Sequence, residues 1–133
     1  MYSITVRNNI LIAHSLPGEV FGPAQNMHGA TYIVDAEFFS ENVNKYNIIM
    51  DLGVVTNILS EVLNFYSYKN LDEVDEFKDI ITSTEFLAKD IYDRICDRLK
   101  KDFSEDYQTL NKLKITLTES NVAWASFEKE IDK

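Results

Sequence analysis

Alternating and helical patterns of apolar residues follow one another along this chain in an order that few folds accommodate. Residues 2–13 and 31–38 alternate apolar with polar side chains, which is typical of strands with one buried face. Between residues 51 and 99 the apolar spacing is that of two helices, and alternation returns between residues 113 and 127. The resulting order, ββααββ, predicts an α+β domain whose four-stranded antiparallel sheet is covered on one face by two helices.

Local signals suggest where these elements begin, end or bend. Arg7-Asn8-Asn9 interrupts the first strand pattern and predicts a bulge or bend there. Asp51 stands where the N-cap of the first helix belongs. Thr82, followed three residues later by Glu85, has the spacing of a capping box and predicts the start of the second helix. Lys100-Lys101 suits the carboxyl end of that helix electrostatically.

Length and composition exclude several classes of protein. The 133 residues predict a single domain, residues 1–133. The net charge of −9 argues against a nucleic-acid partner. No window approaches about 18 uninterrupted apolar residues, so we expect no membrane span, and the first residues lack a signal-peptide pattern. The single cysteine, Cys96, lies in the second predicted helix, excludes an internal disulfide and fits a reducing, cytoplasmic setting.

The two histidines both lie where a strand-like run meets a loop. His14 closes the first apolar run and His28 opens the second, so they converge if the runs pair as antiparallel neighbours. Two neutral imidazoles that meet in this way are the start of a zinc site, although a catalytic zinc normally takes three protein ligands. Ala30 stands where a third would be most natural, and Glu19, in the intervening loop, is the nearest substitute. The simpler alternative is that both histidines are hydrogen-bonded polar residues.

Six short motifs, taken together with the ββααββ order, resemble those of a known family. They are Ala13-His14, His28-Gly29, Ile48-Ile49-Met50-Asp51-Leu52, Leu71-Asp72-Glu73, Thr82-Ser83-Thr84-Glu85-Phe86-Leu87-Ala88 and Thr116-Leu117-Thr118-Glu119-Ser120. Their order and spacing resemble the 6-pyruvoyl-tetrahydropterin synthase and 6-carboxytetrahydropterin synthase family over nearly the whole chain. The resemblance implies a tunnelling fold (T-fold), in which subunits join their sheets into a barrel and binding sites form between chains. We therefore expect a homo-oligomer, in which barrel closure also pairs the exposed sheet edges.

The resemblance also implies roles for individual residues. His14 and His28 match two of the three zinc ligands of the family. Glu119 matches the glutamate that grips the pterin ring, and Ser83 and Thr84 match positions beside the ligand. The reaction that the resemblance implies is a base-assisted elimination of triphosphate from dihydroneopterin triphosphate, in which zinc polarises side-chain oxygens.

Three positions depart from the pattern of that family. Ala30 replaces the third metal-binding histidine, Ala24 replaces the cysteine that serves as base, and Glu73 replaces the histidine that follows the matching Asp72. Glu19 is an alternative base, and it cannot obviously be both base and metal ligand. Asp72 either keeps a catalytic role or is a solvated loop residue.

Glu119 has an argument of its own. By alternation it shares a face with Leu113, Ile115 and Leu117, so it ends an apolar row. A buried carboxylate is costly unless paired, and the amino group and ring N–H of a pterin would form a two-pronged partner. The alternative is that Glu119 lies just outside the core.

These observations predict a divergent member of the pterin synthase family. It binds a pterin or a related purine-like ring, with zinc as the expected cofactor, and acts as a metal-dependent lyase with altered chemistry. The alternative is a non-catalytic tunnelling-fold protein that serves as a binding or scaffold protein. The lost cysteine and histidines favour the alternative, whereas the retained His14, His28 and Glu119 favour the enzyme.

Overall fold

A long antiparallel hairpin forms the first half of the sheet in this computed structural model, which describes residues 1–133. β1 (Tyr2–His14) pairs with β2 (His28–Ser40) residue for residue, from Tyr2 opposite Ser40 to His14 opposite His28. The bulge that we expected at residues 7–9 is therefore wrong. Arg7 instead pairs with Asp35 directly across the hairpin, with 2.7 Å between Nε and Oδ1, so this polar stretch continues the ladder on an exposed surface.

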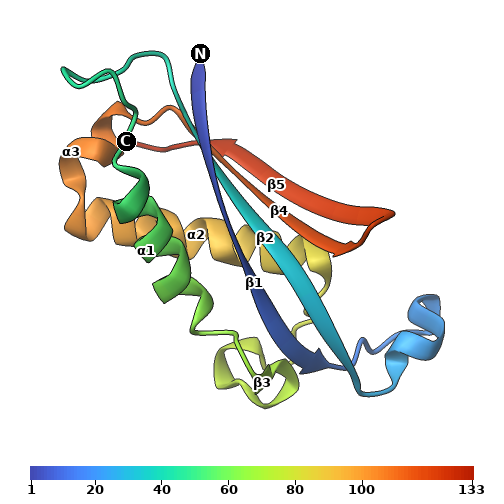
Figure 1. The fold of residues 1–133 in the computed structure, drawn as a ribbon. Helices are drawn as coiled ribbons and strands as arrows, with labels where there is room; N and C mark the ends of the chain where they lie inside the picture. Colours follow the sequence, from blue (N-terminus) through green and yellow to red (C-terminus); the bar gives the residue numbers. More distant parts are fainter.

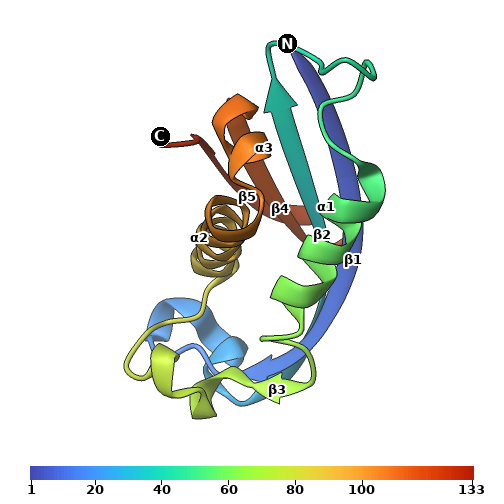
Figure 2. The same cartoon turned by 90° about the vertical axis from the view of Figure 1, so that its left-hand side faces the viewer.

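The second hairpin and the helices complete an α+β fold with the expected ββααββ order. β4 (Lys112–Ser120) lies beside β2, and β5 (Ala123–Glu130) lies beside β4. α1 (Leu52–Leu63) covers β1, and α2 (Thr84–Asp102) covers β4 and β5. Figures 1 and 2 show both helices on the same side of the sheet. The space between the layers is filled by a single cluster of 28 buried apolar residues.

The connections contain short elements that the sequence pattern did not indicate. β3 (Lys69–Asn70) adds a fifth strand, parallel to β1. The sheet therefore has one strand more than the four antiparallel strands that the sequence predicts. Two residues are too few to show a strand period. The other short elements are the 3₁₀ helices η1 (Glu19–Gln25), η2 (Leu71–Glu73) and η3 (Asp75–Phe77) and the helix α3 (Ser104–Thr109). No helix has the length and apolar character that crossing a membrane requires.

The two long helices begin at residues whose side chains cap them. The Asp51 carboxylate accepts a hydrogen bond of 3.0 Å from the backbone N–H of Val54, which confirms the predicted cap of α1. α2 is capped by Ser83, whose Oγ accepts from the backbone N–H of Phe86 at 3.1 Å. The helix therefore begins one residue later than the predicted capping box at Thr82, and no capping box forms, because Phe86 stands three residues after Ser83. The Thr82 side chain instead contacts His14.

The alternating faces of β4 give a direct test of this architecture. Ile115 is fully buried beneath the helices, so Ile115→Ala should lower the free energy of unfolding by roughly 2–5 kcal/mol through the cavity that it leaves. The side chain of Thr116 lies on the opposite face, and Thr116→Ala should change the free energy of unfolding by at most about 1 kcal/mol. Urea denaturation measures both values. Equal losses in the two variants would contradict the assigned faces.

Candidate functional site

The two histidines meet at the end of the β1–β2 hairpin. They lie directly opposite each other, and their ring centroids are 4.7 Å apart with an angle of 61° between the ring planes. His14 is only 1% exposed, whereas His28 is half-buried. Strand alternation places both side chains on the face of the sheet that the helices cover, together with buried Ile12 and Tyr32. The pairing of β1 with β2 thus brings His14 and His28 together, as the sequence predicts.

Hydrogen bonds hold both imidazole rings by the same nitrogen. His28 Nδ1 lies 2.9 Å from the backbone carbonyl oxygen of Asn26, which can only accept, so this nitrogen carries the proton and Nε2 carries a lone pair. His14 Nδ1 lies 3.0 Å from Thr82 Oγ1. Neither Nε2 atom has a hydrogen-bond partner within the protein. The pair therefore presents two Nε2 atoms to a ligand.

Burial sets the charge state of His14. Loss of solvent lowers the pKa of its imidazole, and the neighbouring His28 lowers it further. The negative charge of Asp72 and a hydrogen bond with Thr82 oppose this shift without cancelling it. Because the ordinary pKa of histidine is already about 6.5, His14 is neutral at physiological pH.

Asp72 is brought to the histidine pair by the short strand that the sequence did not reveal. β3 pairs with β1 in parallel, with Asn70 opposite Ala13, so the next turn of chain passes beside the end of β1. Asp72 Oδ2 accepts two hydrogen bonds from Ser15, from the backbone N–H at 3.0 Å and from the hydroxyl at 2.6 Å. Asp72 is exposed, and these two hydrogen bonds hold it beside the end of β1.

Glu119 lies in a second part of the site, at an irregularity in β4. Thr118 pairs with Trp124 and Ser120 pairs with Ala123, so Glu119 has no partner on β5. Such bulges re-aim side chains and are common next to active sites. Glu119 is exposed, which agrees with the alternative that it lies just outside the core. It lines a cavity of about 250 Å³ with the other residues Thr84, Glu85, Ala123, Trp124 and Ala125.

The start of α2 connects this cavity to the histidine pair. Thr82 contacts His14, and two residues later Thr84 lines the cavity and lies 3.3 Å from the Tyr32 hydroxyl. Burial raises the pKa of Tyr32, and the charges of Glu119 and Glu85 add to the rise. Along β2, Ala30 stands between His28 and Tyr32, a span of about 13 Å at ~3.3 Å per residue.

Glu19 lies apart from these residues. It begins η1, in which no residue is buried, and this segment projects beyond the end of the hairpin (Figure 1). No hydrogen bond or ion pair joins Glu19 to the histidines or to Asp72. Gly18 and Gly22, both with positive φ, give the backbone of this loop conformations that other residues rarely adopt.

The donor set does not fit a zinc ion held by three protein ligands. No group of three or more His, Cys, Asp and Glu side chains in the chain is placed to hold one metal ion. His14 and His28 offer two Nε2 atoms, and Ala30, on the same face, offers none. The thiol of Cys96 belongs to α2, where burial raises its pKa to about 11, so it is protonated at neutral pH.

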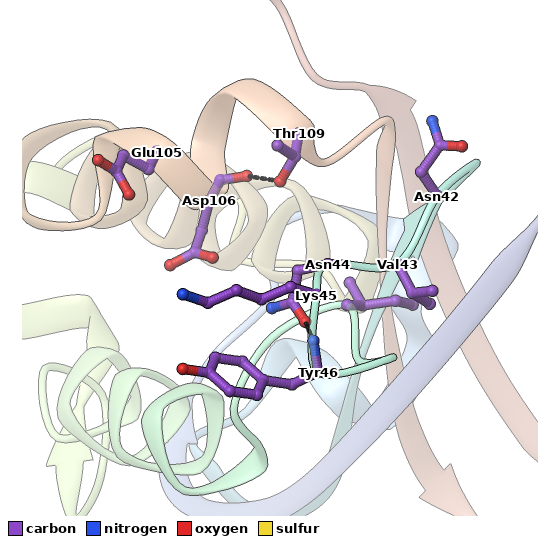
Figure 3. A pocket seen from close by; sticks show the side chains of 9 residues that line it. Asn42, Val43, Asn44, Lys45, Tyr46, Glu105, Asp106 and Thr109 are labelled. Atoms are coloured by element: carbon purple, nitrogen blue, oxygen red, sulfur yellow. Dashed lines mark hydrogen bonds between the residues drawn. The ribbon is translucent and has the colours of Figure 1, made fainter.

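A larger cavity of about 450 Å³ lies at the opposite end of β2 and holds none of the predicted site residues. Figure 3 shows Lys45 and Tyr46, from the connection between β2 and α1, beside Asp106 of α3. Burial and the adjacent Glu105 raise the pKa of Asp106. Because this cavity is remote from the histidines, its residues serve as controls for the site.

Three residues of the site were missed in the sequence. Tyr32 was included only in the alternating run of residues 31–38, and Thr82 and Glu85 only in a capping box. The alternation of β2 does contain a signal for Tyr32, since it follows His28 on the same face. Thr82 carries no such signal, because neighbouring Thr82 and Ser83 are both residue types that cap helices.

Comparisons with known proteins find similar sequences and structures. A sequence model described as 6-pyruvoyl tetrahydropterin synthase matches residues 3–130. The 6-pyruvoyl tetrahydrobiopterin synthase of Dictyostelium discoideum is 31% identical over 105 residues, which are 77% of this chain and 73% of that protein. The structure of Caenorhabditis elegans 6-pyruvoyl tetrahydropterin synthase superimposes with a TM-score of 0.80 at 21% identity, over 96% of this chain and 95% of that one.

A further solved structure has the same fold. It is a Plasmodium vivax 6-pyruvoyltetrahydropterin synthase in which a catalytic residue, a glutamate, is replaced by alanine. It superimposes with a TM-score of 0.78 at 16% identity and covers 98% of both chains. At this identity the match establishes a shared fold.

The lowered pKa of His14 predicts a pH dependence of stability. Between its folded value and about 6.5 the unfolded chain binds more protons, so stability falls as pH drops through this window and the contribution of His14 levels off below it. Urea midpoints measured from pH 7.5 down to 5 should fall less steeply in His14→Gln than in the unchanged protein. The same slope in both proteins would show that His14 is not held neutral.

Proposed function

Because the chain belongs to the 6-pyruvoyl tetrahydropterin synthase family, we propose that it binds a reduced pterin and acts as a lyase on the side chain of the ring. The observation that carries this proposal is the line of groups from Glu119, through Thr84 and Tyr32, to the histidine pair. One end of this line suits a nitrogen-rich ring. The other end suits the oxygens of a side chain.

Glu119 anchors the ring in this proposal. A pterin presents an amino group and an adjacent ring N–H, and a carboxylate accepts both in a two-pronged, charge-assisted arrangement. The cavity around Glu119 also contains the indole of Trp124, an apolar surface that suits a planar ring. Thr84 lies at its edge, and Ser83 keeps a hydroxyl hydrogen free to donate while its Oγ caps α2.

Glu19 is the proposed base. Elimination needs a group that removes a proton from the side chain of the substrate as the phosphate leaves, and the family cysteine position is Ala24. A glutamate is catalytic in the P. vivax relative, which supports a carboxylate in this role. Glu19 would have to approach the histidine pair when ligand binds, and Gly18 and Gly22 flank the loop that would carry it. Asp72 is a positioning residue that holds the end of β1 through Ser15.

No step of this mechanism passes through zinc, because the residues present do not supply three protein ligands. In this proposal, hydrogen bonds position the substrate and one carboxylate removes the proton. The second candidate function, a pterin-binding protein without catalysis, is favoured by the distance of Glu19 from the other site residues. The turnover experiment below separates the two.

A homo-oligomer would complete this site. Trp124 is 65% exposed and Val122 is 80% exposed beside the open cavity. One side of β1 is free of strand partners except at its last residues, and β5 has a free edge. We propose that further copies of the chain pair with these edges. Native mass spectrometry should show a multiple of 15.4 kDa, and a monomer alone at micromolar concentration would contradict the proposal.

Replacement of Glu119 tests the ring site. Glu119→Gln keeps the shape of the side chain but replaces an acceptor-only carboxylate by an amide, so the affinity for 7,8-dihydropterin should fall roughly 10- to 100-fold. Fluorescence titration gives the Kd. Glu105→Gln, at the remote cavity of Figure 3, is the matched control and should leave the Kd unchanged. Equal affinities of Glu119→Gln and the unchanged protein would remove the basis for the ring site.

Replacement of Glu19 tests catalysis. With dihydroneopterin triphosphate as substrate, Glu19→Gln should lower kcat roughly 10²- to 10⁴-fold while the Kd of 7,8-dihydropterin stays constant, because the base acts only in proton transfer. Release of triphosphate measures the rate. Full activity of Glu19→Gln would exclude it as base. No release by the unchanged protein, together with intact pterin binding, would favour the non-catalytic alternative.

A further inference from the structure

Ala30 occupies the position at which a third metal ligand would stand beside His14 and His28. Ala30 lies two residues from His28 on the same face of β2, opposite Ile12, and packs against the core. Its methyl group lies where the sheet alternation would place a third metal-binding side chain. The floor between the imidazoles and Tyr32 is therefore apolar and offers a cation no third protein ligand.

Both imidazoles are nevertheless held as tightly as ligand-binding groups require. The carbonyl oxygen of Asn26 fixes the tautomer of His28, so its Nε2 accepts a hydrogen bond. Thr82 fixes the ring of His14 at the same nitrogen, Nδ1. With centroids 4.7 Å apart, the rings present two neighbouring Nε2 atoms that no protein group uses. A ligand with two neighbouring hydroxyl groups offers one hydrogen-bonding group to each ring.

We propose that His14 and His28 bind the vicinal diol of a pterin side chain directly, without a resident metal ion. The inference rests on the proposed function, because the ring at Glu119 directs the side chain along β2 toward the pair. Ala30 is the residue that determines this mode, since it supplies no third ligand. Thr82 is a positioning residue that orients His14.

The test compares two probes that differ only at the side chain. 7,8-Dihydroneopterin carries the vicinal diol, and 6-methyl-7,8-dihydropterin carries the same ring without it. Protein treated with EDTA should bind the diol about tenfold more tightly, as two hydrogen bonds provide. This preference should be unchanged by added zinc, lost in His28→Ala, and retained in Glu105→Gln. Thr82→Val should reduce it, and Thr82→Ser should restore it.

Metal content gives a readout that does not depend on ligand binding. The unchanged protein should retain almost no zinc after dialysis, whereas Ala30→His should retain about one zinc per chain and lose it again when His28→Ala is added. Circular dichroism checks that each variant folds. If Ala30→His does not fold, the zinc content of the unchanged protein and the diol preference still show whether the histidine pair binds the diol without metal.

The outcomes separate this inference from the proposed function. Equal affinity for the two probes, or one zinc per chain in the unchanged protein that His28→Ala removes, would overturn the metal-free pair and leave the ring site standing. A diol preference that is present only after zinc is added would overturn it as well. Failure of both probes to bind would overturn the proposed function, and this inference with it.

Discussion

The uninterrupted pairing of β1 with β2 is the constraint on which the rest of the structure depends. It places His14 opposite His28 and sets both on the face that the helices cover. A slip of one residue in either strand would turn every side chain of that strand to the opposite face, so the core and the site share one register. Burial of Tyr32, Val34 and Phe38 fixes that register, and the apolar core thereby positions polar groups that contribute nothing to it.

Two local irregularities then give the site its shape. The bulge in β4 leaves Glu119 without a partner on β5, and the start of α2 at Ser83 leaves Thr82 outside the helix. Each leaves one polar side chain outside the repeating structure: Glu119 lines the cavity, and Thr82 contacts His14. Residues 82–84 thus join the histidine pair to the carboxylate cavity.

Sequence patterns predict the parts of this structure that repeat. The buried face of β2 and the Asp51 cap follow from local rules, as does the meeting of the histidines once the strands pair. Patterns fail where a tertiary contact decides. Thr82 and Ser83 are both suitable caps, and the contact with His14 selects between them. β3 has two residues and no period, yet it is what brings Asp72 to Ser15. The polar run at residues 7–9 suggests a bulge because spacing does not reveal that Asp35 lies across from Arg7.

The chain therefore keeps the framework of its family, and the proposed function differs from the family reaction at one end of the site. The carboxylate end remains suited to a pterin ring, and the imidazole end holds two fixed rings without the donors for a three-ligand zinc. A crystal structure of EDTA-treated protein with 7,8-dihydroneopterin tests this account most directly. The account predicts the ring amino group on Glu119, the diol within hydrogen-bond distance of both Nε2 atoms, and no metal between them. A ring bound away from Glu119, for example in the remote cavity beside Lys45, would contradict it.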